Sequence, residues 1–167
     1  MRKKILVVDD EESVTHFLKT FFEKEGYEVV VASDGEEAIR LAEHEKPHLI
    51  TLDVVMPDPD GIQTCAALRA NQKTRAIPII LATGFPEFLA EALHVGVDDF
   101  VTKPFHLAAL LARVRAMLKV SHIEGKAERA MAYIEELRKD LPCEMGDARG
   151  ALTSLREGDG GAVQQRK

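Results

Sequence analysis

The chain has 167 residues and a formal net charge of −6, with 46% hydrophobic and 30% charged residues. It contains no apolar run near the ~20 residues that span a bilayer, and no basic stripe of the kind that binds nucleic acid. The first residues, MRKKILVVDDEE, lack the long apolar stretch of a secretory signal. We therefore expect a globular cytoplasmic protein that contacts neither membrane nor nucleic acid directly.

Short apolar runs alternate with segments of helical periodicity through the first 120 residues. Ser13 is a candidate N-cap and Gly26 a candidate stop for the first helix, and Asp34 with Glu37 indicates a capping box for the second. The predicted strands are residues 4–8, 28–32, 48–52, 77–82 and 99–102, and the predicted helices are about 13–25, 35–44, 62–70, 87–95 and from 106 onward.

Strand–helix repeats with short connections predict a parallel sheet that is covered by helices on both faces. In such sheets, ligands bind outside the carboxyl ends of the strands. Polar residues follow four of these ends: Asp9 and Asp10, Asp53, Thr83, and Lys103. We expect these residues, which are far apart in the sequence, to meet at one edge of the sheet.

Three carboxylates at one edge repel each other, and a hard divalent cation relieves that repulsion. Mg²⁺ prefers oxygen ligands in octahedral geometry and keeps some water or phosphate oxygens. Asp9 or Asp10 together with Asp53 would supply carboxylates, and a backbone carbonyl such as that of Val55 can supply a third oxygen. The pattern predicts a Mg²⁺ site.

Lys103 and Thr83 add a compact cation and a hydroxyl donor to the same edge. Together with a metal, these groups would offset charge on a phosphoryl group that is transferred to Asp53. The residues therefore indicate phosphoryl transfer onto an aspartate.

Five segments resemble, in order and spacing, the receiver domain of two-component response regulators, the CheY-like superfamily: ILVVDDEE, LDVVMPDPDG, PIILATG, GVDDFVTKPF and LLARVRAMLK. The resemblance covers about residues 3–120. It implies an α/β, flavodoxin-like, doubly wound sheet of five parallel strands in the order 2-1-3-4-5.

The resemblance also implies roles for individual residues. Asp53 would be the phosphoacceptor, and a histidine kinase or a phosphotransfer protein would donate the phosphoryl group. Mg²⁺ would be the cofactor. The implied metal ligands are Asp9, Asp10, Asp53 and the carbonyl of Val55. The remaining implied roles are phosphate binding for Thr83, Gly84 and Lys103, switching for Thr83 and Phe100, and a cis peptide bond before Pro104.

The sequence departs from the family pattern around the site. Phe100 stands where the family often has tyrosine, and Gly84 where it often has alanine. Val55 and Phe85 make the expected rim of the site apolar. We predict that this rim slows attack by water and lengthens the lifetime of the phosphorylated form.

In the family, the face formed by helix four, strand five and helix five commonly delivers the signal to a downstream protein. Winged-helix regulators dimerise there through charged pairs. Asp99 and Arg113 occupy matching positions, whereas Ala109 and Val120 are uncharged where charges are expected. Homodimerisation through this face is therefore left open, and the downstream protein is unknown.

Residues 121–142 are predicted to form a helical extension or linker, and residues 143–167, which are small, polar and glycine-rich, a disordered tail. The helix would dock on its own receiver, on a second copy or on a partner, or would simply extend the preceding helix and pack weakly. Its apolar residues recur in steps of three and four, a short heptad seam: Ala127, Ala130, Ile134, Leu137 and Leu141.

The leading interpretation is a phosphorylation-controlled signalling module that is not an enzyme beyond its own phosphorylation and dephosphorylation. One alternative is a binding scaffold that never accepts phosphate. A second is a Mg²⁺-dependent aspartyl phosphohydrolase, but such enzymes tend to carry an acid two residues after the nucleophile, where this chain has Val55.

Overall fold

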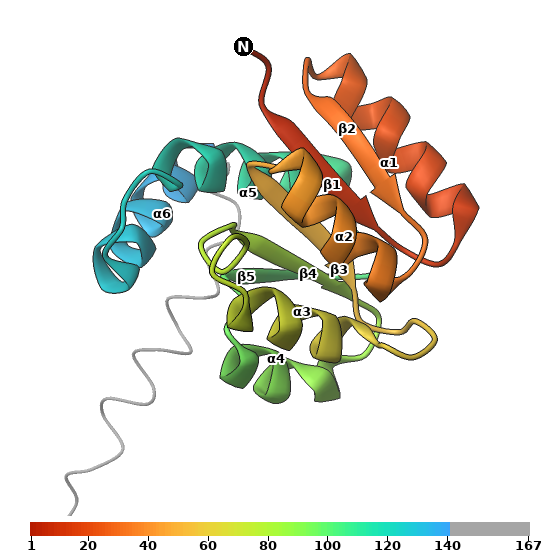
Figure 1. Ribbon diagram of the computed structural model, residues 1–167. Helices are drawn as coiled ribbons and strands as arrows, with labels where there is room; N and C mark the ends of the chain where they lie inside the picture. Colours follow the sequence, from red (N-terminus) through yellow and green to blue (C-terminus); the bar gives the residue numbers. More distant parts are fainter. Residues whose placement is uncertain (141–167) are drawn as a thin grey trace, which may run out of the picture.

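The computed structural model describes residues 1–140. The predicted tail of residues 143–167, and Leu141 of the predicted seam, lie outside the described residues. Five strands form one parallel sheet in the order β2-β1-β3-β4-β5, which confirms the expected topology (Figure 1). The strands are β1 (Lys4–Val8), β2 (Glu28–Ala32), β3 (Leu49–Asp53), β4 (Ile79–Thr83) and β5 (Asp99–Thr102).

Helices follow each strand, and a further helix follows the last of them. The helices are α1 (Glu12–Lys24), α2 (Gly35–Glu45), α3 (Gly61–Ala70), α4 (Leu89–Val95), α5 (Leu107–Val120) and α6 (Lys126–Asp140). A 3₁₀ turn, Pro86–Phe88, precedes α4, in a segment where a single helix was predicted. In the described part of the chain, no helix has the length and apolar character needed to cross a membrane.

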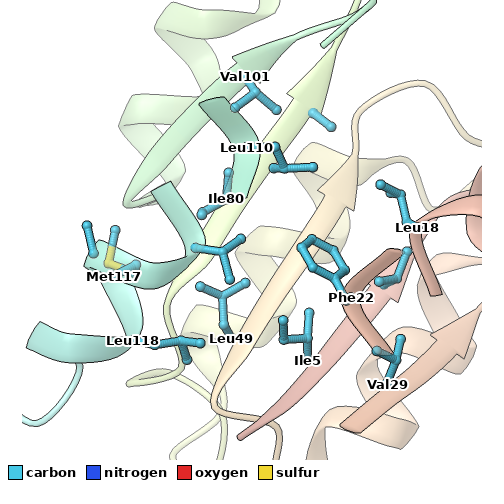
Figure 2. Packing of buried hydrophobic residues seen from close by; sticks show 14 of the residues in the cluster. Ile5, Leu18, Phe22, Val29, Leu49, Ile80, Val101, Leu110, Met117 and Leu118 are labelled. Carbon is cyan, nitrogen blue, oxygen red and sulfur yellow. The ribbon is translucent and has the colours of Figure 1, made fainter. Parts of the chain in front are cut away.

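Each face of the sheet carries its own hydrophobic core. Alternate residues of the strands pack against α1 and α5 on one face and against α2, α3 and α4 on the other. Figure 2 shows the first of these cores, where Phe22 of α1 and Leu110 of α5 meet Ile5, Leu49 and Ile80 of the strands. Burial of such side chains, at about 1.5–3 kcal/mol each, stabilises the strands that carry the polar edge.

The helix ends differ in part from the predictions. Ser13 lies inside α1, and the N-cap position is Glu11, whose side chain makes no cap hydrogen bond. Asp34 caps α2 by accepting from the backbone N–H of Glu37, but the Glu37 carboxylate accepts from Ser33 instead of completing the box. A complete capping box, Asp60 with Gln63, begins α3 and was not predicted.

The predicted seam of α6 is wrong for three of its residues, since Ala127, Ala130 and Ile134 are exposed. Leu137 of the seam is half-buried against the core that α5 also covers, and the buried residue of the helix is Tyr133. Heptad counting of aliphatic residues missed the tyrosine, which lies one helical turn before Leu137. The helix does dock on its own receiver, beside α5 at one edge of the molecule (Figure 1).

Candidate functional site

Strand register brings the polar residues to one edge of the sheet. Val8 is level with Leu52, so Asp9 and Asp53 stand side by side at the ends of β1 and β3. Asp53 pairs with Ala82, one residue before Thr83, and Thr83 pairs with Thr102, one residue before Lys103. The sequence thus positions these groups through the pairing of strands that are mostly apolar.

Three carboxylates form a tight cluster at this edge. Oxygen atoms of Asp9, Asp10 and Asp53 lie within 4.8 Å of one another. Asp9 and Asp53 are buried, whereas Asp10 is exposed. Hard oxygen donors in this number suit a divalent cation such as Mg²⁺, with Asp10 on the side open to water.

The Lys103 ammonium lies between two of the acids. Its Nζ is 2.7 Å from Asp9 Oδ2 and 3.2 Å from Asp53 Oδ1. The second oxygen of Asp9 accepts from the backbone N–H of Glu11 at 3.0 Å. Asp9 is therefore held from two sides, and a positive charge stands directly beside Asp53.

The pKa values of the pair reflect burial and mutual charge. Burial raises the pKa of the Asp53 carboxyl above its ordinary value, an effect that the Lys103 ammonium opposes and the Asp9 charge reinforces. Burial acts to lower the pKa of Lys103, but its contacts with Asp9 and Asp53 outweigh that effect and raise it. The lysine therefore stays charged at neutral pH.

The Thr83 hydroxyl is fully buried and bonded within its own loop. Its Oγ1 accepts from the backbone N–H of Phe85 at 2.9 Å and lies 3.3 Å from the Phe85 carbonyl oxygen. It therefore has to rotate before it can donate to a group on Asp53. The backbone N–H of Lys103 donates to the Thr83 carbonyl at 2.8 Å, which fixes the two strand ends together.

The loop after Asp53 is shaped by close packing. An added Cβ on Gly61 would lie 2.0 Å from the carbonyl oxygen of Asp53, so only glycine allows α3 to begin so near the end of β3. The Gly61 N–H donates to the Val54 carbonyl at 2.9 Å. The peptide bonds before Pro59 and Pro104 are cis.

Two exposed apolar side chains come shortly after the strand ends of this edge. Val55 and Phe85 are each about half exposed, at 49% and 48%. The ring of Phe85 packs edge-on against Phe88. Gly84 is exposed, and an added Cβ there would meet its nearest neighbour, Lys103 Cβ, at 4.0 Å. The half-buried Phe100 packs against the core on the sheet face that α2, α3 and α4 cover.

Some polar contacts near β5 were not predicted. Asp98 is paired with Arg69 of α3 at 2.8 Å and with Arg129 of α6 at 3.1 Å. Asp99 accepts hydrogen bonds from Arg113 and from the hydroxyl of Tyr133. The sequence did hold one signal for these contacts of α6: a repeat of four residues that places Arg129, Tyr133 and Leu137 on one side of the helix.

The fold and this arrangement of acids define a receiver. The model of the response regulator receiver domain family matches residues 5–115, and the chain belongs to that family. It is a receiver with a phosphoacceptor role in two-component signalling.

Curated relatives extend this finding. Over 125 residues the chain is 49% identical to the alkaline phosphatase synthesis transcriptional regulatory protein PhoP of Bacillus subtilis, a match that covers 74% of this chain and 51% of PhoP. It is 46% identical over 120 residues to the probable transcriptional regulator ycf27 of Cyanophora paradoxa, covering 71% and 49%. The chain therefore spans about half the length of the curated relatives that it matches.

Solved structures agree with the fold. The BeF₃-activated N-terminal receiver domain of Klebsiella pneumoniae RstA is 32% identical, with a TM-score of 0.65 and coverage of 70% of this chain and 99% of that one. The receiver domain of the sensor histidine kinase PA1611 of Pseudomonas aeruginosa, described with magnesium in its active-site cleft, is 27% identical, with a TM-score of 0.67 and coverage of 71% and 99%.

Proposed function

We propose that Asp53 is the phosphoacceptor of this receiver, and that a histidine kinase or a phosphotransfer protein is the donor. The observation that carries the proposal is the position of the Lys103 ammonium, 3.2 Å from Asp53 and 2.7 Å from Asp9. In this arrangement one oxygen of Asp53 attacks phosphorus, the bond from phosphorus to the donor nitrogen breaks, and the phosphoryl group stays on the carboxylate.

We assign the stabilisation of negative charge on the transferring phosphoryl group to the residues around Asp53. Lys103 offsets negative charge on the phosphoryl oxygens as it builds in the transition state. After its hydroxyl leaves Phe85, Thr83 donates to one of those oxygens, and the exposed backbone at Gly84 lies beside them. Each group acts from the end of a strand, where its position is fixed by the sheet.

A divalent cation is part of the proposal. The clustered oxygens of Asp9, Asp10 and Asp53 fit Mg²⁺, and we assign the backbone carbonyl of Val55 as a further ligand. When bound, Mg²⁺ supplies positive charge against the carboxylates and the incoming phosphoryl group. The magnesium described for the PA1611 receiver supports this assignment.

The domain organisation follows from the same assignment. We assign residues 3–120 to the receiver and residues 121–140 to a helical extension; the last two residues of the predicted extension, 141 and 142, lie outside the described residues. The only reactions of the chain are the phosphorylation and dephosphorylation of its own aspartate. We propose that the protein is cytoplasmic, where it meets its kinase. Phosphorylation shifts Thr83 and Phe100 and so alters the face of α4, β5 and α5 that meets a downstream protein.

Intact-protein mass spectrometry after incubation with acetyl phosphate and Mg²⁺ tests the phosphoacceptor. A single phosphoryl adduct is expected in the parent and in Asp58→Asn, which changes an exposed acid of the same loop. The adduct should be absent in Asp53→Ala. If the parent takes up no phosphoryl group, or Asp53→Ala keeps it, the non-phosphorylated scaffold becomes the better description.

A further inference from the structure

Part of the face formed by β5 and α5, at the start of β5 and the C-terminal half of α5, is already occupied by a helix of the same chain. Tyr133 of α6 is 8% exposed, and Ala132 and Leu137 are half-buried against the same core. These residues, with Arg129 and Glu136, lie on one stripe of α6 at helical spacing. The receiver thus already binds an amphipathic helix at this face.

Polar contacts fix the register of that helix. The Tyr133 hydroxyl donates to Asp99, which also accepts from Arg113. Arg129, one turn earlier, pairs with Asp98 at 3.1 Å, and Glu136 pairs with Lys119 at 3.0 Å. Two adjacent acids at the start of β5 therefore recognise an arginine and a tyrosine four residues apart.

The fit of α6 is incomplete. A groove of about 250 Å³ remains between it and the receiver, lined by Val97 and Met117 on one side and by Ala130 and Ile134 on the other. Among the described residues of α6, Tyr133 is the one that is buried. A helix that buries so little apolar surface is held mainly by its polar contacts and by its tether.

The tether is short. Five residues, Ser121–Gly125, separate the end of α5 from the start of α6. A short linker gives a tethered ligand an effective concentration of about millimolar, so even weak docking keeps a competitor in solution away. Occupation of the face thus depends on the tether as well as on the contacts.

We propose that the β5–α5 face is a helix-binding surface whose tethered occupant is α6, and that a partner protein binds there by presenting an amphipathic helix with an arginine and a tyrosine one turn apart. Asp98 and Asp99 recognise those two side chains, and the groove beside Val97 and Met117, which α6 leaves unfilled, takes an apolar side chain of the partner helix. The partner helix binds only when α6 has left.

The test uses the full chain and a fluorescent peptide of residues 122–140. In one variant, Arg129→Ala and Tyr133→Ala together remove the contacts with the two acids. In the control variant, Met131→Ala and Glu135→Ala change exposed residues of the same helix. Fluorescence anisotropy measures the dissociation constant of the peptide from each protein, and none of the measurements involves phosphoryl transfer.

The peptide is expected to bind the first variant at least about tenfold more tightly than the parent or the control, because the internal competitor is weakened. A peptide that carries the same two alanine substitutions should not bind. Equal affinity for all three proteins would overturn the proposal. So would a first variant that runs as a dimer in light scattering without binding the peptide, since a second receiver would then be the occupant.

Hydrogen exchange of the parent chain gives an independent measurement, which does not depend on the folding of any variant. Docked α6 should protect its amides beyond the level of an isolated helix of 15 residues, which is marginal in water. Exchange at the rate of an unstructured peptide would contradict docking. Because this measurement involves no phosphorylation, neither outcome affects the assignment of Asp53 as the phosphoacceptor.

Discussion

Lys103 lies closer to Asp9 than to Asp53, at 2.7 Å against 3.2 Å. The ammonium therefore holds the acid that is proposed to bind metal and at the same time faces the acid that is proposed to react. A phosphoryl group that arrives on Asp53 meets this cation without any rearrangement of the sheet. The two contacts explain why a lysine directly follows the fifth strand.

Lys103→Gln is expected to slow phosphorylation by acetyl phosphate by about 10²-fold, the usual effect of removing one group that stabilises charge in a transition state. The glutamine keeps a polar side chain, one atom shorter than that of lysine, but brings no charge. Lys119→Gln, which removes an exposed ammonium on α5, is the matched control. A rate within twofold of the parent for Lys103→Gln would rule out this role.

The raised pKa of Asp53 predicts how Mg²⁺ affinity depends on pH. Burial keeps the proton on this carboxyl up to a higher pH than on an ordinary aspartate, so protons compete with Mg²⁺ as the pH falls toward that raised pKa. The Mg²⁺ affinity measured by calorimetry should fall by up to about tenfold for each pH unit below the pKa of Asp53.

The variant Asp53→Asn is the control for that titration. It should bind Mg²⁺ more weakly at neutral pH, and its affinity should begin to fall only at a lower pH, because the acid with the raised pKa is gone. Identical pH profiles for the parent and the variant would mean that Asp53 takes no part in metal binding.

The apolar rim predicts a long-lived phosphorylated form. Val55 and Phe85 are exposed apolar residues, each two positions after a residue of the site, and their side chains offer no hydrogen bond to an attacking water. Val55→Asn and Phe85→Glu should each speed dephosphorylation, because each brings a polar group that can hold water near Asp53. The decay of the phosphorylated form, followed by mass spectrometry, is the measurement. Unchanged or slower decay in both variants would contradict the prediction.

Asp99 links the proposed switch to α6. One of its oxygens accepts from the backbone N–H of Phe100 at 2.8 Å, and the other accepts from Arg113 and Tyr133. A shift of Phe100 after phosphorylation would therefore disturb the bond that holds α6. Beryllofluoride with Mg²⁺ should speed hydrogen exchange in α6 by about fivefold or more, at the lower end of usual coupling energies.

The comparison with Asp53→Ala isolates that effect, because this variant cannot form the adduct and its α6 should exchange at the resting rate. If the parent forms the beryllofluoride adduct but hydrogen exchange in α6 does not change, phosphorylation of Asp53 does not control the docking of α6. The proposed helix-binding surface would then remain, but without control by Asp53.

The sheet and its acidic edge were predictable because parallel strands must end together. Asp9 and Asp53 each come at the end of a buried, mostly aliphatic run and Lys103 follows β5, so their positions follow once the strand order is known. The direction of the Thr83 hydroxyl was not predictable, since a rotatable hydroxyl takes whichever partner is near, here Phe85.

The docked face of α6 was missed for a different reason. Its aliphatic residues follow a heptad pattern, but the buried side chain of the helix is Tyr133, and its hydroxyl donates to Asp99. Burial beside that acid raises the pKa of Tyr133, so the hydroxyl remains a donor at neutral pH. A partner that lies 34 residues away in the chain cannot be read from local periodicity.

Two glycines near the site should respond oppositely to alanine. At Gly61 the new Cβ would lie 2.0 Å from the Asp53 carbonyl oxygen, a backbone atom that cannot move aside without displacing β3 or α3. Gly61→Ala should therefore lower the free energy of unfolding by about 1–3 kcal/mol or more, as overpacking does, and should also slow phosphorylation because it displaces Asp53.

At Gly84 the nearest atom to a new Cβ is 4.0 Å away, and the position does not require a left-handed backbone. Gly84→Ala should leave stability unchanged or raise it by up to about 0.4–1 kcal/mol, because alanine restricts the unfolded chain. Urea unfolding of both variants, with the phosphorylation rate measured alongside, checks the pair. A strongly destabilised Gly84→Ala would mean that the loop between β4 and α4 is packed more tightly than its contacts indicate.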